Sequence, residues 1–255
     1  MKNSDLGEFA SSSKVTTMSV EFTEIGLAPN FIDYASAWDL QRSVHDGVVA
    51  GNVPNTALLL EHAPVYTAGK RTEEHERPFD GTPVINVDRG GKLTWHGPGQ
   101  LVMYPIVRLA DAHSIRAYVH ALEDIIIEVL AHFTIDGVRV EGRAGIWLLA
   151  DNKGPTRKIA AIGIRVHDGV TMHGIAINAN NSLEPYNQII ACGIQDAGTT
   201  TMAAETGEDI TPRDLLSHVQ LATEKFLAPL ITEFAPHEAT TADAVDTARP
   251  EGALP

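Results

Sequence analysis

Hydrophobic residues recur at every third or fourth position in three segments of the chain, a spacing typical of amphipathic helices. The pattern predicts helices over residues 33–49, 114–132 and 212–228. The residues expected on their buried faces are Tyr34, Ala37, Leu40, Val44 and Val48 in the first helix, Tyr118, Ala121, Leu122, Ile125, Ile126, Val129 and Leu130 in the second, and Leu215, Leu216, Val219, Ala222 and Phe226 in the third.

Start and stop signals flank these helices. Ser114 precedes the second helix and is expected to cap its first turn. Thr211 precedes the third helix, with Pro212 in the first turn and Asp214 three residues later, which predicts a capping box. Gly51 follows the first helix and is expected to end it.

Shorter runs rich in Val, Ile and Leu, with Gly or Asp at their ends, predict β-strands. These runs cover residues 56–61, 83–87, 101–107, 144–150, 158–166 and 170–178. The last two are joined by His167-Asp168-Gly169, and Asp-Gly between two such runs is a strong signal for a β-hairpin. Adjacent hairpin strands favour a mixed or antiparallel sheet, so the predicted class is α+β or mixed α/β, without a strict βαβ repeat.

The composition is that of an ordinary globular protein. The 255 residues are 44% hydrophobic and 20% charged, which excludes collagen-like, low-complexity and wholly disordered chains. Residues 1–18 are polar without an apolar period, and residues 236–255 are rich in Ala, Thr, Asp and Pro. We therefore expect one domain over residues 19–235, with a flexible N-terminal tail and a disordered C-terminal tail.

Several classes of protein are not expected from this sequence. No run of 18 or more apolar residues is present, so we expect no transmembrane helix and no membrane partner. The N-terminal residues lack the apolar core of a secretory signal. The single cysteine excludes an intramolecular disulfide and a four-cysteine zinc site, and the scattered histidines form no metal-binding pattern. A cytoplasmic location is the expectation that follows.

The net formal charge of −14 argues against a nucleic-acid partner, because phosphate binding requires a basic surface. The charge is unevenly distributed along the chain. Residues 70–165 contain 13 Lys and Arg against 12 Asp and Glu, whereas the remaining residues contain 6 against 21. This difference is consistent either with chance scatter or with a basic rim around a site that receives an acidic partner.

A glycine-rich segment covers residues 89–100, with four glycines in twelve residues after a predicted strand. Such a loop can bring backbone N–H groups close to a ligand, although many glycine-rich loops are only turns. Its spacing fits neither the Walker phosphate loop nor the dinucleotide-binding fingerprint. Gly163 and Gly174 lie on either side of the predicted hairpin, where small residues leave room for a ligand.

Cys192 and Lys158 are candidate catalytic residues. A lone cysteine is either a small buried hydrophobic residue or a nucleophile, and its thiol needs a neighbouring cation or base to ionise at neutral pH. Lys158 opens an apolar strand, where it lies either in water or inside a site beside an anion. His96 and His173 are the other candidates for activating the thiol.

Four blocks taken together resemble the lipoyl(octanoyl) transferases. They are Arg-Gly-Gly-x-x-Thr-x-His-Gly-Pro-Gly-Gln at residues 89–100, Lys-Ile-Ala-Ala-Ile-Gly at 158–163, His-Gly-Ile-Ala-Ile-Asn at 173–178 and Ala-Cys-Gly-Ile at 191–194. The resemblance extends over roughly residues 20–230, and Trp95 stands where Tyr or Phe is common. It implies a biotin/lipoate protein ligase-like catalytic domain: a mixed, largely antiparallel sheet with packed helices.

The resemblance also implies an activity and a set of site residues. Cys192 and Lys158 are the implied catalytic pair. The implied substrate-binding residues are Arg89, Gly90, Gly91, Lys92, Leu93, Thr94, Trp95, His96, Ala161, Ile162, Gly163, Gly174, Ile175 and Ala176. The implied reaction moves an octanoyl group from octanoyl-acyl carrier protein to a lysine of an apo lipoyl domain, through a thioester on the cysteine, in the first step of endogenous protein lipoylation.

The partners implied in this way are the octanoyl-acyl carrier protein and the apo lipoyl domains of 2-oxo acid dehydrogenases and of the glycine cleavage H protein. No metal and no resident cofactor are expected, because the phosphopantetheine arm enters as part of the donor. We expect the protein to act as a monomer. Three alternatives stay open: an ATP-dependent lipoate-protein ligase, a Cys/His thioester hydrolase, and a lipoyl-domain binding module without activity.

Overall fold

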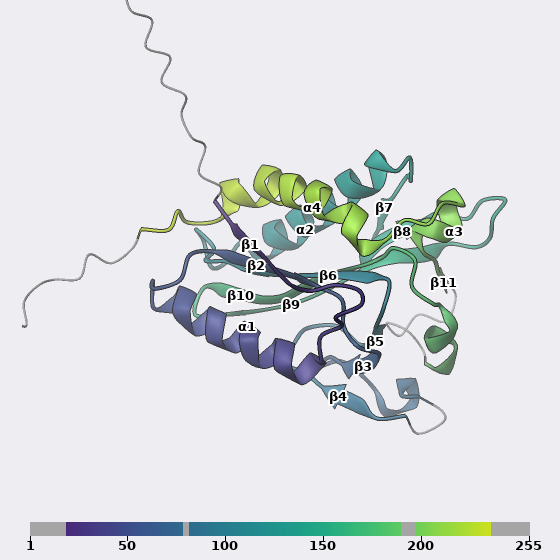
Figure 1. Ribbon diagram of the computed structural model, residues 1–255, viewed down its shortest axis with the longest axis horizontal. Coiled ribbons are helices and arrows are strands. Elements are labelled where there is room, and N and C mark those ends of the chain that lie inside the picture. Colours follow the sequence, from purple (N-terminus) through teal and green to yellow (C-terminus); the bar gives the residue numbers. More distant parts are fainter. Residues whose placement is uncertain (1–18, 79–81, 190–196, 236–255) are drawn as a thin grey trace, which may run out of the picture.

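The computed structural model describes residues 19–78, 82–189 and 197–235, and these residues form two sheets with packed helices (Figure 1). In spatial order, the large sheet contains β1 (Glu21–Gly26), β2 (Thr56–Leu60), β6 (Gln100–Ile106), β10 (Val170–Asn178), β9 (Arg157–His167), β8 (Arg143–Leu148) and β7 (Val138–Val140), and β11 (Gly198–Thr199) also pairs with β9. Only β1 with β2 and β11 with β9 run parallel in this sheet. The small sheet contains β4 (Val84–Asn86), β3 (Val65–Ala68) and β5 (Leu93–His96). The predicted mixed, largely antiparallel sheet is confirmed.

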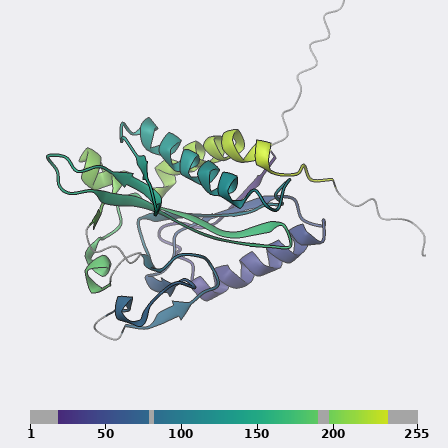
Figure 2. The ribbon, with the colours of Figure 1, turned by 180° about the vertical axis from the view of Figure 1, so that it is seen from behind.

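Helices cover both faces of the large sheet (Figures 1 and 2). Helices α2 (Ile115–His132) and α4 (Pro212–Leu227) pack on one face and enclose the main hydrophobic core. Helix α1 (Tyr34–Val49) packs on the other face, where the small sheet also lies. The remaining helical segments are short: α3 (Met202–Thr206) and the 3₁₀ turns Glu74–Glu76, Glu184–Gln188 and Ala228–Leu230. The segment between β4 and β5 contacts β9, where the N–H of Gly90 donates to the carbonyl of Ile164.

The predicted helices are confirmed, with two local differences. Thr211 and Asp214 form the expected capping box at the start of α4. Ser114 occupies the N-cap position of α2, but its side chain makes no cap and instead donates a hydrogen bond to Asp111, so the predicted cap is wrong. Leu40 of α1 is 38% exposed, whereas Gln41 is buried. The buried face of α1 therefore includes polar residues that a hydrophobic period cannot indicate.

The predicted hairpin between β9 and β10 is confirmed. Both central residues of the turn have positive φ, 49° at Asp168 and 73° at Gly169, as a tight two-residue hairpin requires. Strands β1, β3, β5, β7 and β11 were not predicted. All five are only two to six residues long, and β5 lies inside the glycine-rich segment, so their local patterns are weak.

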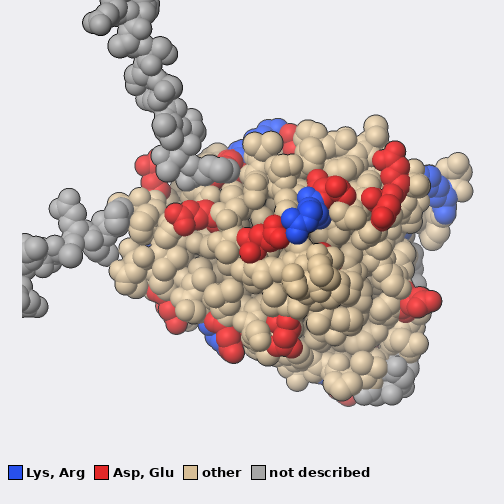
Figure 3. Space-filling model, in the orientation of Figure 1, with Lys and Arg blue, Asp and Glu red and all other residues tan. Residues whose placement is uncertain are grey.

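Figure 3 shows the surface in the orientation of Figure 1, with acidic side chains spread over this face and few basic ones. The picture agrees with the excess of Asp and Glu in the sequence. Within the described ranges, no helix has the length and apolar character needed to cross a membrane. Residues 1–18 and 236–255, which we predict to be tails, lie outside the described residues, so the predicted domain limits stay a prediction.

Candidate active site

A cavity of about 300 Å³ is lined by both sheets and by the first turn of α1. Its walls come from the glycine-rich segment, from β9 and β10, and from the start of β8. The residues that line it are Tyr34, Arg71, Arg89, Gly91, Lys92, Thr94, His96, Tyr104, Gly142, Arg143, Ala144, Lys158, Ala161, Ile162, Gly163, His173, Gly174, Ile175 and Ala176. The cavity thus brings together three of the four sequence blocks that carried the resemblance.

Small residues leave room on the wall formed by β9 and β10. Ala161 pairs with Ala176 across the two strands, and Gly163 pairs with Gly174. A Cβ atom at Gly163 would lie 2.9 Å from Cδ of Arg89, and one at Gly174 would lie 2.2 Å from the carbonyl oxygen of Met103. Both glycines are therefore needed for close packing, while the alanines add only methyl groups to the wall.

Arg89 holds the glycine-rich segment in place from the inside. Its buried guanidinium donates hydrogen bonds to the carbonyls of Gly90 at 3.0 Å, Lys92 at 2.9 Å and Thr67 at 2.9 Å. The N–H of Gly90 donates to the carbonyl of Ile164 on β9 at 2.9 Å. These bonds tie the segment both to the small sheet and to the large one, so the cavity wall is rigid on this side.

The strand alternation of β5 divides the predicted binding residues between its two faces. Thr94 and His96 line the cavity. Leu93 and Trp95 point to the other face, where they pack in a small apolar cluster with Tyr66 and other residues. Neither of them lines the cavity, and neither does Gly90.

His96 is a neutral hydrogen-bonding residue of the cavity. Its Nδ1 lies 2.7 Å from Oε1 of Gln100, and the side-chain amide nitrogen of Gln100 donates to Asn178 at 2.8 Å. Because the oxygen of Gln100 therefore faces His96, Nδ1 of His96 carries the proton and Nε2 is an acceptor. Burial lowers the pKa of His96 to about 3, so the ring is uncharged at neutral pH.

His62 is a neighbour of His96 outside the cavity lining, with 5.6 Å between the ring centroids. Its Nε2 lies 2.7 Å from the hydroxyl of Tyr104, which lines the cavity. Burial lowers the pKa of His62 to about 4. Two uncharged histidines thus lie next to each other, and His96 is the one that lines the cavity.

These two histidines should make the protein less stable in mild acid. Both folded-state pKa values, about 4 for His62 and about 3 for His96, lie below the ordinary 6.5, so the unfolded chain binds more protons below pH 6.5. When the pH falls from 7 to 5, each histidine should lower the free energy of unfolding by about 2 kcal/mol. Urea unfolding of His62→Gln or His96→Gln should therefore show a smaller decrease in the free energy of unfolding between pH 7 and pH 5 than the unmodified protein shows. If the free energy of unfolding of both variants depended on pH as in the unmodified protein, the two histidines would not be buried uncharged groups as described.

Lys158 lies on the cavity wall although it is only 9% exposed. Its Nζ lies 4.7 Å from the ring centroid of Trp147 on β8. No Asp or Glu side chain among the described residues lies within ion-pair distance of this nitrogen. Lys158 is thus a buried ammonium that faces a cavity with an aromatic ring as its neighbour.

A β-bulge turns Lys158 toward the cavity. Ile146 pairs with Ala160, but the next residue of β8, Trp147, pairs with Lys158, so Ile159 is an extra residue on β9. Ile159 and Ala160 both belong to the main core. Without the bulge, Lys158 would lie on the same face as Ala160, because side chains alternate along a strand.

His173 lies at the far end of the cavity from Lys158. It pairs with Ile164, six residues along β9 from Lys158, which corresponds to about 20 Å. Its Nε2 lies 2.8 Å from Oδ1 of Asp88, and its backbone has a φ of 57°. Burial lowers the pKa of His173, although Asp88 opposes the change. These contacts orient His173 toward Asp88 and away from the Lys158 end.

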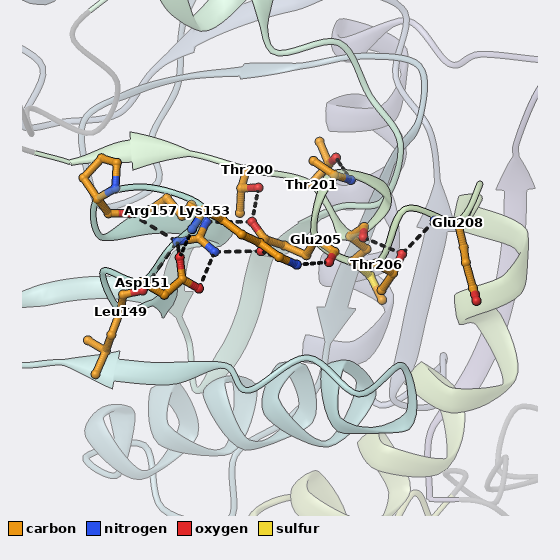
Figure 4. A network of polar contacts seen from close by, with 12 residues as sticks. Leu149, Asp151, Lys153, Arg157, Thr200, Thr201, Glu205, Thr206 and Glu208 are labelled. Atoms are coloured by element: carbon orange, nitrogen blue, oxygen red, sulfur yellow. Dashed lines mark hydrogen bonds and ion pairs between the residues drawn. The ribbon is translucent and has the colours of Figure 1, made fainter.

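Figure 4 shows an ion-pair network around Arg157, the residue before Lys158 on β9. The Arg157 and Glu205 side chains in it are each 8% exposed, whereas Asp151 is 44% exposed. The Arg157 guanidinium donates two hydrogen bonds to Glu205, at 2.6 and 2.7 Å, and two to Asp151, both at 3.0 Å. Glu205 also accepts from the hydroxyl of Thr200 at 2.5 Å. Arg157 holds the pKa values of Glu205 and Asp151 below their ordinary range. The network ties α3 and the residues after β11 to the strand that carries Lys158.

The cavity is also lined by residues that the sequence did not indicate as site residues. They are Tyr34, Arg71, Tyr104, Gly142, Arg143 and Ala144. They come from separate segments, and only the folded arrangement brings them to one place. Cys192, the predicted nucleophile, lies outside the described residues.

Comparison with known proteins places the chain in a family. Residues 33–224 match the sequence model of the family described as lipoyl protein ligase A/B catalytic domain. The chain is 67% identical over 223 residues to the octanoyltransferase of Renibacterium salmoninarum, covering 88% of this chain and 91% of that protein. It is 59% identical over 237 residues to the octanoyltransferase of Pseudarthrobacter chlorophenolicus, covering 93% of this chain and all (100%) of that protein.

Solved structures share the fold at low sequence identity. A bipartite lipoate protein ligase from Thermoplasma acidophilum aligns with a TM-score of 0.61 at 11% identity, covering 83% of this chain and 85% of that one. A lipoate-protein ligase A bound with ATP aligns with a TM-score of 0.55 at 10% identity, with the same coverage of 83% and 85%. The predicted lipoate ligase-like fold is thereby confirmed. Together with the sequence relatives, it establishes that the chain is an acyltransferase of the lipoyl protein ligase A/B catalytic domain family and belongs to the lipoyl(octanoyl) transferases.

Proposed function

We propose that the protein transfers an octanoyl group from octanoyl-acyl carrier protein to a specific lysine of an apo lipoyl domain, through a thioester on Cys192. The acceptors are the lipoyl domains of 2-oxo acid dehydrogenases and the glycine cleavage H protein. The reaction is the first step of endogenous protein lipoylation and takes place in the cytoplasm. The relatives named octanoyltransferase support octanoyl as the group that is transferred. The cavity supports the proposed reaction because Lys158 lines it.

The observation that carries the proposal is the placement of Lys158. A buried ammonium is costly unless an anion lies close to it. Lys158 faces the cavity, and among the described residues its Nζ lies beside the Trp147 ring and forms no ion pair with a carboxylate. A thiolate in the cavity would supply the missing anion. The ammonium would in turn favour ionisation of the thiol, whose ordinary pKa of about 8.5 leaves it mostly protonated at neutral pH.

Chain connectivity supports Cys192 as the source of that thiolate. Thr199 of β11 pairs with Lys158, and the N–H of Thr200 donates to the carbonyl of Lys158 at 2.9 Å. Gly198 is six residues from Cys192 in the sequence. The chain therefore pairs with Lys158 only a few residues after Cys192 in the sequence.

In the first half of the reaction, the Cys192 thiolate attacks the carbonyl carbon of the donor thioester. The bond from that carbon to the carrier sulfur then breaks, and the carrier leaves as a thiol after taking a proton from the Lys158 ammonium. Backbone N–H groups of the glycine-rich segment are candidates for stabilising the oxyanion between these steps. The product is an octanoyl thioester on Cys192 beside a neutral Lys158.

In the second half, neutral Lys158 takes a proton from the acceptor ammonium, and the resulting amine attacks the octanoyl thioester. The bond to Cys192 sulfur breaks, the attacking nitrogen loses its second proton to solvent, and an amide forms beside a Cys192 thiolate and a Lys158 ammonium. Exchange of one thioester for another is nearly isoenergetic, and conversion of a thioester to an amide is downhill. The reaction therefore needs no ATP and no resident cofactor, because the phosphopantetheine arm arrives with the donor.

The acyl chain has an apolar wall available in the cavity. Ala161 and Ala176 present their methyl groups to the cavity, whereas Ile162 and Ile175 line it through their backbone because their side chains pack in the main core. Each methylene buried there contributes about 0.8 kcal/mol, which favours chains that fill the cavity without exceeding its length.

The histidines are poor candidates for a Cys/His thioester hydrolase. A general base works best when its pKa lies near the operating pH. Burial lowers the pKa of His96 to about 3, so this ring is a weak base. His173 is directed to Asp88 at the opposite end of the cavity from Lys158.

The proposal is tested by measuring octanoylation of an apo lipoyl domain from octanoyl-acyl carrier protein, with and without ATP. We expect the same rate in both cases and little free octanoate. Strict dependence on ATP would identify a ligase. Release of octanoate at the same rate without acceptor would identify a hydrolase, and binding of the lipoyl domain without acylation would identify a binding module.

Transfer from the carrier protein should weaken as the salt concentration rises. The cavity is lined by Arg71, Arg89, Lys92, Arg143 and Lys158, and no Asp or Glu is among the described residues that line it. Carrier proteins are typically acidic, so opposite charges should assist their encounter with this region. We expect kcat/KM for octanoyl-acyl carrier protein to fall several-fold between 50 and 300 mM salt, and that for a small uncharged octanoyl thioester to stay nearly constant. Equal salt sensitivity of the two donors would contradict an electrostatic role.

A further inference from the structure

We propose that Trp147 is a positioning residue for Lys158: its indole face holds the ammonium at the cavity wall and leaves the N–H donors of that ammonium free for an anion in the cavity. The inference rests on the proposed function, because it gives Trp147 a role in activating Cys192 through Lys158. It concerns a residue outside the four sequence blocks that carried the resemblance.

The geometry that supports this role is a cross-strand pair. Trp147 on β8 and Lys158 on β9 are direct neighbours at the bulge, and Nζ of Lys158 lies 4.7 Å from the ring centroid. This distance is within the range of a cation–π contact. The bulge that turns Lys158 toward the cavity therefore also sets it over the ring.

The indole ring is itself fixed. Trp147 is 1% exposed, and its Nε1 donates a hydrogen bond to the carbonyl of Arg143 at 3.2 Å. The Arg143 guanidinium lies over the same ring, with Cζ 5.6 Å from the centroid. Burial and the hydrogen bond leave the ring little freedom, so it can define the position of the lysine.

An aromatic ring suits this position better than a carboxylate. A carboxylate beside Lys158 would stabilise the ammonium but would also compete with a thiolate for it. The π face attracts the ammonium without carrying a net charge. The network around Arg157, with Glu205 and Asp151, shows that carboxylates pair with the neighbouring residue on the opposite face of β9 instead.

The test measures the pH dependence of alkylation by iodoacetamide, which reports on Cys192 alone because the chain has one cysteine. The variants are Trp147→Phe, Trp147→Met, Lys158→Met and the double variant Trp147→Met/Lys158→Met. Phe226→Leu is the matched control, because it removes a ring 4.8 Å from the ammonium of Lys225 on α4, which packs on the other face of the sheet.

We expect Trp147→Met to slow alkylation at pH 7 by about 2- to 30-fold and to move the midpoint of the profile upward, with a smaller effect for Trp147→Phe. In the Lys158→Met background, Trp147→Met should have no further effect, because the ring acts through the lysine. The control Phe226→Leu should match the unmodified protein. A merely structural role of Trp147 would slow alkylation equally in both backgrounds, and this result would overturn the inference.

A second measurement avoids any change of side-chain size. Replacing the three tryptophans with fluorinated tryptophan weakens the π face while keeping the shape of the ring. Alkylation should slow with increasing fluorination in the unmodified sequence and should not change in Lys158→Met. If Lys158→Met itself leaves the profile unchanged, the proposed pairing of Lys158 with Cys192 is wrong and the inference fails with it. If Lys158→Met shifts the profile and neither Trp147→Met nor fluorination does, only the role of Trp147 is wrong.

Discussion

Replacing Cys192 with serine should reduce octanoyl transfer by about 10⁴-fold or more, because the hydroxyl that remains is a far weaker nucleophile at neutral pH. A serine hydroxyl does not ionise under the influence of one neighbouring ammonium, whereas a thiol near its ordinary pKa of about 8.5 does. Binding of octanoyl-acyl carrier protein should stay within about threefold, because the cavity walls are unchanged. The measurement is steady-state transfer to an apo lipoyl domain, together with a direct binding titration of the carrier protein.

The variant Lys158→Met tests the role of the lysine separately from that of the cysteine. It keeps a side chain of similar length but removes the ammonium, so acylation should slow while the thiol remains present. Residual transfer by Cys192→Ser that approaches the unmodified rate would mean that the cysteine is not the nucleophile. Unchanged transfer by Lys158→Met would instead remove the lysine from the mechanism and leave the cysteine in place.

Replacing Arg157 with methionine should reduce the free energy of unfolding by about 3–5 kcal/mol. The substitution leaves the carboxylates of Glu205 and Asp151 without the guanidinium that pairs with both of them. The Arg157 and Glu205 side chains are each 8% exposed, so solvent replaces little of this pair, whereas Asp151 is 44% exposed and solvent can hydrate its carboxylate. Urea unfolding at pH 7 measures the change.

The pH dependence of this effect has a defined sign. The folded-state pKa values of Glu205 and Asp151 lie below their ordinary values of 4.5 and 3.8, so the stabilisation is present above pH 5 and is lost as the pH falls through the folded-state pKa values. The variant and the unmodified protein should therefore differ less below pH 4. Arg213→Met is the control, because Arg213 pairs with Glu24 at the surface with 61% exposure and should cost about 1 kcal/mol or less. An equal decrease in the free energy of unfolding in Arg157→Met and Arg213→Met would contradict a special role for the network around Arg157.

Local signals were sufficient for the helices and for one hairpin. The apolar stripe of α2 is wide and is buried as expected, and the Thr211 capping box and the Asp168-Gly169 turn need only a few consecutive residues. The order of strands in the sheets could not be obtained in this way. Strand β5 is four residues long between glycines, and its partner β3 is 25 residues earlier in the chain, so the pairing depends on tertiary contacts.

The buried face of α1 shows why a hydrophobic period can fail at a functional site. Gln41 is fully buried because its side-chain oxygen accepts a hydrogen bond at 2.9 Å from the backbone N–H of His173. His173 also has a positive φ of 57°, a feature that no sequence pattern indicated. The buried face of α1 runs through Ala37, Gln41 and His45, and Leu40, which the period placed inside, lies beside this face and is 38% exposed.

The candidate site was predictable only in part: residue patterns indicated the glycine-rich segment, Gly163, Gly174, Lys158 and the histidines as candidates, and the resemblance supplied their roles. The resemblance treated residues 89–96 as one block, but alternation along β5 sends Leu93 and Trp95 to the face opposite the cavity. Tyr104 was outside the blocks, because it reaches the cavity from β6 through sheet pairing rather than through sequence proximity. The bulge that turns Lys158 toward the cavity depends on its register with β8, which the sequence did not specify.

Intact-mass spectrometry after brief incubation with octanoyl-acyl carrier protein tests directly whether an anionic sulfur beside the Lys158 ammonium carries the acyl group. We predict that the protein gains the mass of one octanoyl group, that peptide mapping assigns it to Cys192, and that adding an apo lipoyl domain removes it while the domain becomes octanoylated. Octanoylation of the lipoyl domain at full rate without any acyl group ever appearing on Cys192 would contradict the account.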